Sequence, residues 1–178
     1  MHNFWGHLST ITIHKWRVMK LCFRCGLYKQ GLKHDLSKYS PVEFIPGVRY
    51  FQGNRSPINR EKELHGYSMG WLHHKGRNPH HWEYWLDNGD EAQHGVKPVH
   101  MPVNYVVEMF CDRIAASRTY MKEKYHDASA YEYFMNGYDR VMMHPETKDL
   151  LQSLLEYHRD HGLDETIAYI RKDILKNK

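Results

Sequence analysis

Cysteine is scarce in this chain, which has three among 178 residues. An odd number of cysteines, in a chain without an export signal, argues against a disulfide framework. Cys22 and Cys25 form a CxxC pair, but a tetrahedral zinc site needs two further soft ligands, and Cys111 is the remaining thiol. We therefore expect the three thiols to pack in the interior rather than to bind zinc or act in redox chemistry.

Long runs of one residue class are also missing. No stretch of 18 apolar residues occurs, and polar residues such as His7 and His14 interrupt the N-terminal segment, so neither a membrane-spanning helix nor a signal peptide is expected. The net charge is +4, and Lys and Arg form no block of five or six like charges. This favours mild attraction to phosphate compounds over a nucleic-acid partner. We expect a cytoplasmic protein with no membrane partner, and the sequence leaves a homo-oligomer open.

Alternating strand patterns are rare, whereas apolar residues recur at spacings of three and four, so the sequence predicts an all-α fold. The sequence predicts Ser40 as the N-cap of a helix, Pro41 as its first residue and Glu43 as the glutamate of a capping box. Pro46-Gly47 should disturb that helix, and Gly162-Leu163 should divide the last one before Asp164 restarts it. The helices expected from these signals cover residues 3–25, 30–38, 60–74, a short segment from Asn78-Pro79, 102–124, a short segment from Ser129, and 145–176, with loops at 53–59 and 87–100.

Histidine is the surplus, with 15 residues scattered through the chain. His14 lies within an apolar stripe of the first helix, where a histidine is more often a core residue than a ligand. His34-Asp35 can converge on a metal, with Lys38 on the same face, although an ion pair explains them equally well. Of the pairs His73-His74 and His80-His81, the apolar stripe of the preceding helix favours His74 as the inward member of the first.

The long helix at 102–124 carries Glu108 and Asp112 on one face. Two like charges at this spacing cost stability unless something positive lies opposite, and a metal or Arg113 could supply it.

In order along the chain, His14, His34-Asp35, His74, His81 and Asp112 resemble the H…HD…H…H…D pattern of the HD-domain superfamily of metal-dependent phosphohydrolases, which are all-α. More closely, the chain resembles a bacterial and phage family of similar length with no established function. The resemblance implies a helical metal-binding core at residues 1–126, with a C-terminal helical extension at 127–178 packing on it.

Carried over residue by residue, the resemblance makes His14, His34, Asp35 and Asp112 the ligands of one metal. His74 and His81 would hold a second ion, with Asp35 bridging, and the choice within each histidine pair stays open. One or two divalent ions are implied, and imidazole and carboxylate ligands suit Mn, Fe, Co, Ni or Zn without selecting among them.

The leading hypothesis is metal-assisted hydrolysis of a nucleotide or other small phosphorylated metabolite. Lys38, Arg77 and Arg113 would neutralise phosphate charge, and Glu108 would act as general base or orient a ligand. Four aromatic residues could stack a base, although core packing explains them more simply. They are Trp71, Trp82, Tyr84 and Trp85.

Two other functions are compatible with the same residues. One is an HD-type enzyme that uses two irons to activate oxygen and acts on a small polyol or phosphonate. The other is a metal-binding or nucleotide-binding protein without turnover.

Overall fold

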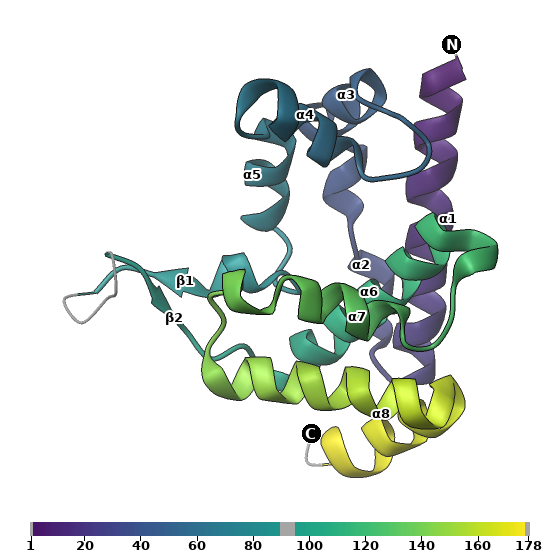
Figure 1. Cartoon of the computed structure of the whole chain (residues 1–178), viewed down its shortest axis with the longest axis vertical. Helices are drawn as coiled ribbons and strands as arrows, with labels where there is room; N and C mark the ends of the chain where they lie inside the picture. Colours follow the sequence, from purple (N-terminus) through teal and green to yellow (C-terminus); the bar gives the residue numbers. More distant parts are fainter. Residues whose placement is uncertain (1, 90–94, 177–178) are drawn as a thin grey trace.

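The computed structural model describes residues 2–89 and 95–176, and it is all-α as the sequence predicts, apart from one small hairpin (Figure 1). No helix in these residues is both long and apolar enough to cross a bilayer. The helices are α1 (His2–Arg24), α2 (Tyr28–Lys33), α3 (Pro41–Arg49), α4 (Pro57–His65), α5 (Met69–Lys75), α6 (Val103–Met121), α7 (Ser129–Asn136) and α8 (Pro145–Tyr169). Shorter helical turns cover Leu36–Tyr39, Trp82–Trp85, Lys122–Lys124, Tyr138–Arg140 and Ile170–Ile174.

The hairpin overlaps the predicted 87–100 loop and begins one residue before it. Its strands, β1 (Leu86–Asp87) and β2 (Lys97–Pro98), pair antiparallel and project from the helices (Figure 1). Residues 90–94 of that predicted loop lie outside the described residues.

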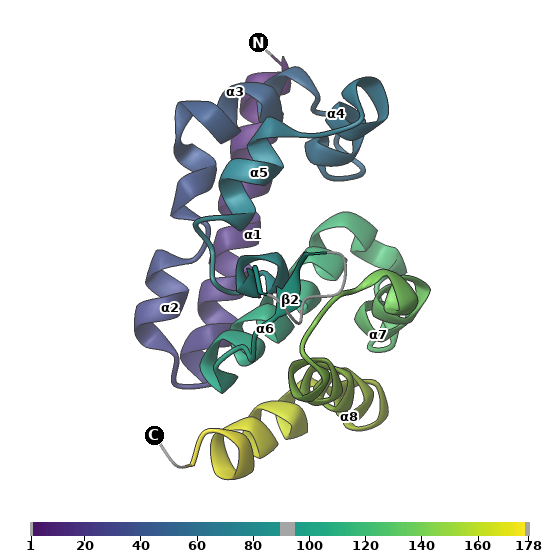
Figure 2. The same cartoon turned by 90° about the vertical axis from the view of Figure 1, so that its left-hand side faces the viewer.

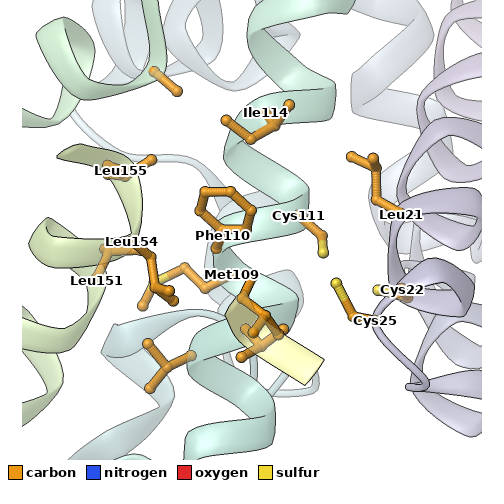
Figure 3. Packing of buried hydrophobic residues seen from close by; sticks show 14 of the residues in the cluster. Leu21, Cys22, Cys25, Met109, Phe110, Cys111, Ile114, Leu151, Leu154 and Leu155 are labelled. Atoms are coloured by element: carbon orange, nitrogen blue, oxygen red, sulfur yellow. The ribbon is translucent and has the colours of Figure 1, made fainter. Parts of the chain in front are cut away.

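Helix α6 is the centre of the molecule, with α1 on one side and α8 on the other (Figure 3). Phe110 is 1% exposed and belongs to one continuous apolar cluster with Leu21 of α1 and Leu154 of α8. The C-terminal helices thus pack on the same core as the N-terminal ones. Helices α3, α4 and α5 lie at the opposite end of the molecule from α8 (Figure 2).

The three cysteines lie in this core, between α1 and α6 (Figure 3). Cys22, Cys25 and Cys111 are all buried and free of disulfides. They belong to none of the clusters with metal-ligand spacing found among the described residues. The expectation that they pack in the interior is confirmed.

Three predicted helices differ from the structure. The predicted 30–38 helix ends at Lys33, because His34 is extended and Asp35 is left-handed, with φ of 55°. The predicted 60–74 helix is divided: Gly66 ends α4 with φ of 78°, and the Ser68 hydroxyl caps α5 by accepting from the Trp71 amide.

The third difference is at Asn78-Pro79, which begin no helix. The Asn78 side chain instead donates back to the His74 carbonyl and closes the end of α5. The capping box is also wrong, because Glu43 bonds to histidines of α5 and Ser40 makes no side-chain cap. The predicted break at Gly162 is confirmed, since that residue has a non-helical φ of 76° inside α8.

Far from these segments, His158 of α8 is fully buried and predicts a pH dependence of stability. Its Nε2 lies 3.0 Å from the Tyr125 hydroxyl, and its ring meets Phe110 edge-on. Burial lowers the pKa of His158, although Asp127 acts in the opposite direction. The unfolded chain therefore takes up this proton more readily, so stability is lost as the pH falls below about 6.5.

We expect His158→Gln to flatten the fall in the free energy of unfolding between pH 7 and pH 5. The wild type should lose up to about 1.4 kcal/mol per pH unit more than the variant, measured by urea unfolding at each pH. His161→Gln, at a half-exposed position of the same helix, is the control. Parallel pH profiles for the wild type and His158→Gln would contradict the prediction.

Candidate metal centre

All six residues predicted as metal ligands converge at one place. His14 comes from the middle of α1, His34 and Asp35 from the end of α2, and His74 from α5. His81 lies in the turn after α5, and Asp112 lies on α6. Their ligand atoms form two clusters, within each of which the atoms lie no more than 4.8 Å apart.

The first cluster consists of His14, His34, Asp35 and Asp112. His14 Nε2 lies 2.9 Å from Asp112 Oδ1 and 3.6 Å from Asp35 Oδ2. His34 Nε2 lies 3.3 Å from the same Asp35 oxygen. Two imidazoles and two carboxylates surrounding one point form a ligand set typical of a divalent transition metal.

The second cluster uses the other oxygen of the same carboxylate. His74 Nε2 and His80 Nε2 lie 3.3 and 3.4 Å from Asp35 Oδ1, and His81 Nε2 lies 2.9 Å from His74 Nε2. The sequence left the choice between His80 and His81 open, and both histidines lie in this cluster. Because Asp35 directs one oxygen to each cluster, it has the position of a carboxylate that bridges two ions.

The backbone of Asp35 explains this position. A non-glycine residue with φ of 55° costs on the order of 1 kcal/mol, and such conformations persist where the surroundings hold them. The left-handed turn stops α2 and turns the carboxylate between α1, α5 and α6. A 3-10 turn follows and returns Lys38, whose Nζ lies 2.6 Å from Asp35 Oδ2.

The charges within the site favour ionised carboxylates and a neutral His81. Burial raises the pKa of Asp35, but the positive charges of His34 and Lys38 outweigh it and hold that pKa well below its usual range. Burial lowers the pKa of His81, and the neighbouring histidines His80 and His74 lower it further. Burial lowers the pKa values of His34 and His74, but the charge of Asp35 outweighs it and raises both. Metals bind carboxylates and neutral imidazoles, so a metal would displace the protons of these two histidines.

The polar atoms at the centre of the site also fit a metal. The Nε2 atoms of His14, His34 and His80 and Oδ1 of Asp35 are buried and make no hydrogen bond to any described residue. Buried polar atoms are nearly always paired, so a group of four directed at one region calls for a partner. A pair of divalent cations would satisfy all of them.

Two glutamates hold the outer nitrogens of the histidines. Glu108 Oε1 lies 2.9 Å from His34 Nδ1 and 3.3 Å from His80 Nδ1. Glu43 accepts from His74 Nδ1 at 2.7 Å and from His73 Nδ1 at 2.6 Å. This arrangement directs the Nε2 atoms of His34, His74 and His80 toward the centre of the site and leaves His73 outside the clusters. The sequence predicts Glu43 as part of a helix cap, so its hydrogen bonds to His73 and His74 were not predicted.

Of the two roles considered for Glu108, the geometry supports orientation of ligands. Burial raises the pKa of Glu108, but hydrogen bonds from His34 and His80 bring it down to about 2. A carboxylate of that pKa, already paired with two imidazoles and with Gln30, is a poor general base near neutral pH.

We expect Glu108→Gln to weaken metal affinity by roughly 10- to 100-fold, because a neutral amide oxygen is a weaker acceptor for the two imidazoles that meet Oε1. The amide NH2 would also replace Oε2, which accepts from the Gln30 side chain. Competition with a fluorescent chelator measures the affinity. Glu132→Gln, an exposed glutamate of α7, is the control. Unchanged affinity in Glu108→Gln would show that the two histidines do not need a charged acceptor.

Of the three cationic side chains predicted to bind phosphate, one lies at the site. Lys38 lies beside the clusters, as above. Arg77 is exposed, and its Nη1 donates to the His73 carbonyl at 3.5 Å. Arg113 follows Asp112 in the chain but packs on the ring of Phe134, with its Cζ 5.4 Å from the ring centroid. The structure thus brings Lys38 to the site and directs the two arginines elsewhere.

The sequence of the chain matches one known protein family. Residues 3–157 match a family of unknown function, DUF5662, and the chain belongs to that family. The match continues past residue 126 into α8, so the family includes most of the C-terminal segment as well as the metal-ligand clusters. No curated protein and no solved structure matches the chain.

Proposed function

We propose that the protein is a metal-dependent phosphohydrolase that holds two divalent ions and acts on a small phosphorylated metabolite. One observation carries the proposal: the Asp35 carboxylate lies between two clusters of histidines whose inward nitrogens are largely unpaired. Two ions bridged by a carboxylate are a recurrent solution for phosphoester hydrolysis. The order of the ligands along the chain, which resembles that of the HD-domain superfamily, supports the same chemistry.

Divalent ions held by the two clusters that share Asp35 would supply a water of lowered pKa as nucleophile and would polarise the phosphoryl oxygens. The chain's own residues provide the rest. Asp35 spaces the two clusters, while Glu108 and Glu43 orient three of the histidines. Lys38 is 27% exposed and directs its ammonium to the edge of the site, where it can neutralise a phosphoryl oxygen.

The test combines metal content with turnover. Untagged protein is analysed for its metals, then stripped, reloaded with Mn, Fe, Co, Ni or Zn, and assayed for phosphate release from aryl and alkyl phosphate monoesters. Close to two ions per chain and metal-dependent phosphate release are expected. Two irons, a mixed-valence signal and no phosphate release would instead favour the oxidative alternative, and metal binding without either reaction would favour a binding protein.

A further inference from the structure

A small, partly open cleft of about 60 Å³ lies beside the metal-ligand clusters and shares two residues with their surroundings. Lys38 lines the cleft and also contacts Asp35, and Glu43 lines it while holding His74. A small ligand lying in this cleft would therefore place one end at Lys38 and the metal centre. Its other end would meet walls built from α1, α3, α4 and α6.

His7 of α1 forms part of these far walls. It is 6% exposed, its ring packs against Phe44 and Phe51, and its Nδ1 has no hydrogen-bond partner among the described residues. Burial, and then the charge of Lys38, lower the pKa of His7 to about 4, so the imidazole is neutral. The ring lies against Gly47 of α3, where an added Cβ would stand 2.2 Å from Nε2. Glycine at this position thus makes room for a buried, unpaired polar ring.

Glu61 and Tyr120 supply two more polar groups to the cleft. Glu61 is 9% exposed and accepts from the Ser68 hydroxyl, and it makes no ion pair within the described part of the chain. Burial raises the pKa of Tyr120, so its phenol stays protonated and can donate. A carboxylate acceptor, a neutral imidazole and a phenol match the donors and acceptors of hydroxyl groups.

The cleft offers little to a polyphosphate or a nucleobase. Among the described residues that line it, Lys38 is the one side chain with a permanent positive charge. The aromatic residues considered for base stacking are absent from its lining: Trp71 stacks on His74, and the Trp85 indole donates to the Pro79 carbonyl. Ile11, Pro57 and Ile58 also line the cleft, so its polar groups stand on a largely apolar surface. One phosphoryl group on a small uncharged body with a few hydroxyls fits these walls better than a nucleotide does.

We propose that the substrate is a phosphate monoester of a sugar or other polyol, with its phosphate at Lys38 and the metal centre and its hydroxyls bonded to His7, Glu61 and Tyr120. This inference rests on the proposed function and names the substrate class of the same site.

The experiment compares kcat/KM of the metal-loaded protein for sorbitol 6-phosphate, phenyl phosphate, AMP and ATP. Phenyl phosphate has no hydroxyl group, so it reports the metal centre with little help from the far walls. Sorbitol 6-phosphate should be the best of the four. Glu61→Gln should reduce kcat/KM for sorbitol 6-phosphate at least about tenfold more than for phenyl phosphate, because a hydrogen bond to a charged acceptor is lost.

Two further variants keep the result interpretable. Tyr120→Phe removes one hydroxyl without changing the shape of the cleft. Like Glu61→Gln, it should reduce kcat/KM for sorbitol 6-phosphate more than kcat/KM for phenyl phosphate. Glu63→Gln is the matched control, because Glu63 lies on the same helix as Glu61 but pairs with Arg55 at the surface. Its kcat/KM values should stay within about twofold of wild type, as expected for a surface pair.

Failure of this inference is distinguishable from failure of the proposed function. Two outcomes would overturn the proposed substrate class and leave the proposed hydrolase function intact. One is hydrolysis of phenyl phosphate together with a preference for AMP or ATP. The other is an equal loss of kcat/KM on sorbitol 6-phosphate and phenyl phosphate in Glu61→Gln. Hydrolysis of none of the four would overturn the hydrolase. The cleft is then tested by binding: sorbitol 6-phosphate should raise the melting temperature of the metal-loaded wild type but not of Glu61→Gln, and an equal shift in both would overturn it.

Discussion

Under the proposed function, replacing Asp35 with asparagine is expected to abolish binding of two metal ions and to lower phosphoester hydrolysis by at least about a thousandfold. Asp35 is the one residue that belongs to both main clusters, with Oδ2 toward His14 and His34 and Oδ1 toward His74 and His80. An amide presents a single, neutral oxygen, so it can serve one cluster at most. Without the two ions, the proposed reaction would lose several kcal/mol of transition-state stabilisation. A loss of about 4 kcal/mol corresponds to a thousandfold lower rate.

Metal content and turnover are measured on the same preparations of the Asp35→Asn variant. Asp149→Asn, at an exposed position of α8, is the matched control and should keep both properties. A circular dichroism spectrum and a melting curve show whether the variant is folded. A folded Asp35→Asn protein that still binds two ions would mean that the carboxylate is structural.

Part of the candidate site was accessible from the sequence because His14 and Asp112 lie on regular helices. His14 falls within the apolar stripe of α1, and Asp112 lies one turn from Glu108 on α6, so helical periodicity directs both inward. The preference for His74 over His73 agrees with the structure, where the His73 side chain bonds to Glu43 outside the clusters. The apolar stripe that predicted it does not hold, because Gly66 divides that helix and Leu64 and Tyr67 are exposed.

The missed features depend on irregular backbone and on contacts between distant segments. His80 and His81 both face Asp35 because the chain makes a turn there, whereas a helix would have separated adjacent side chains by about 100°. The role of Glu43 depends on contact between α3 and α5, 31 residues apart in the case of His74. The local sequence from Ser40 to Glu43 predicts a helix cap, but His73 and His74 of α5 bind the Glu43 carboxylate instead.

Removing the metal should affect stability as strongly as it affects activity. The ligands join α1, the end of α2, α5 with the turn after it, and α6, so a metal bound only by the folded chain stabilises all of these contacts together. At a free metal concentration of about a thousand times Kd, one site adds about 4 kcal/mol to the free energy of unfolding. For a chain of this length, that shifts the melting temperature by roughly 8 to 16 °C.

We therefore expect chelator-stripped protein to melt at least about 8 °C below protein reloaded with its preferred ion, measured by scanning calorimetry. The Asp35→Asn variant should lose most of this difference. Hydrogen exchange gives a local measure: metal should slow exchange around His14, His34 to Lys38 and the α5 segment, and should change α8 little, because α8 supplies no ligand. Equal melting temperatures with and without metal would count against a metal centre, whereas uniform slowing that includes α8 would mean that the whole chain unfolds as one unit.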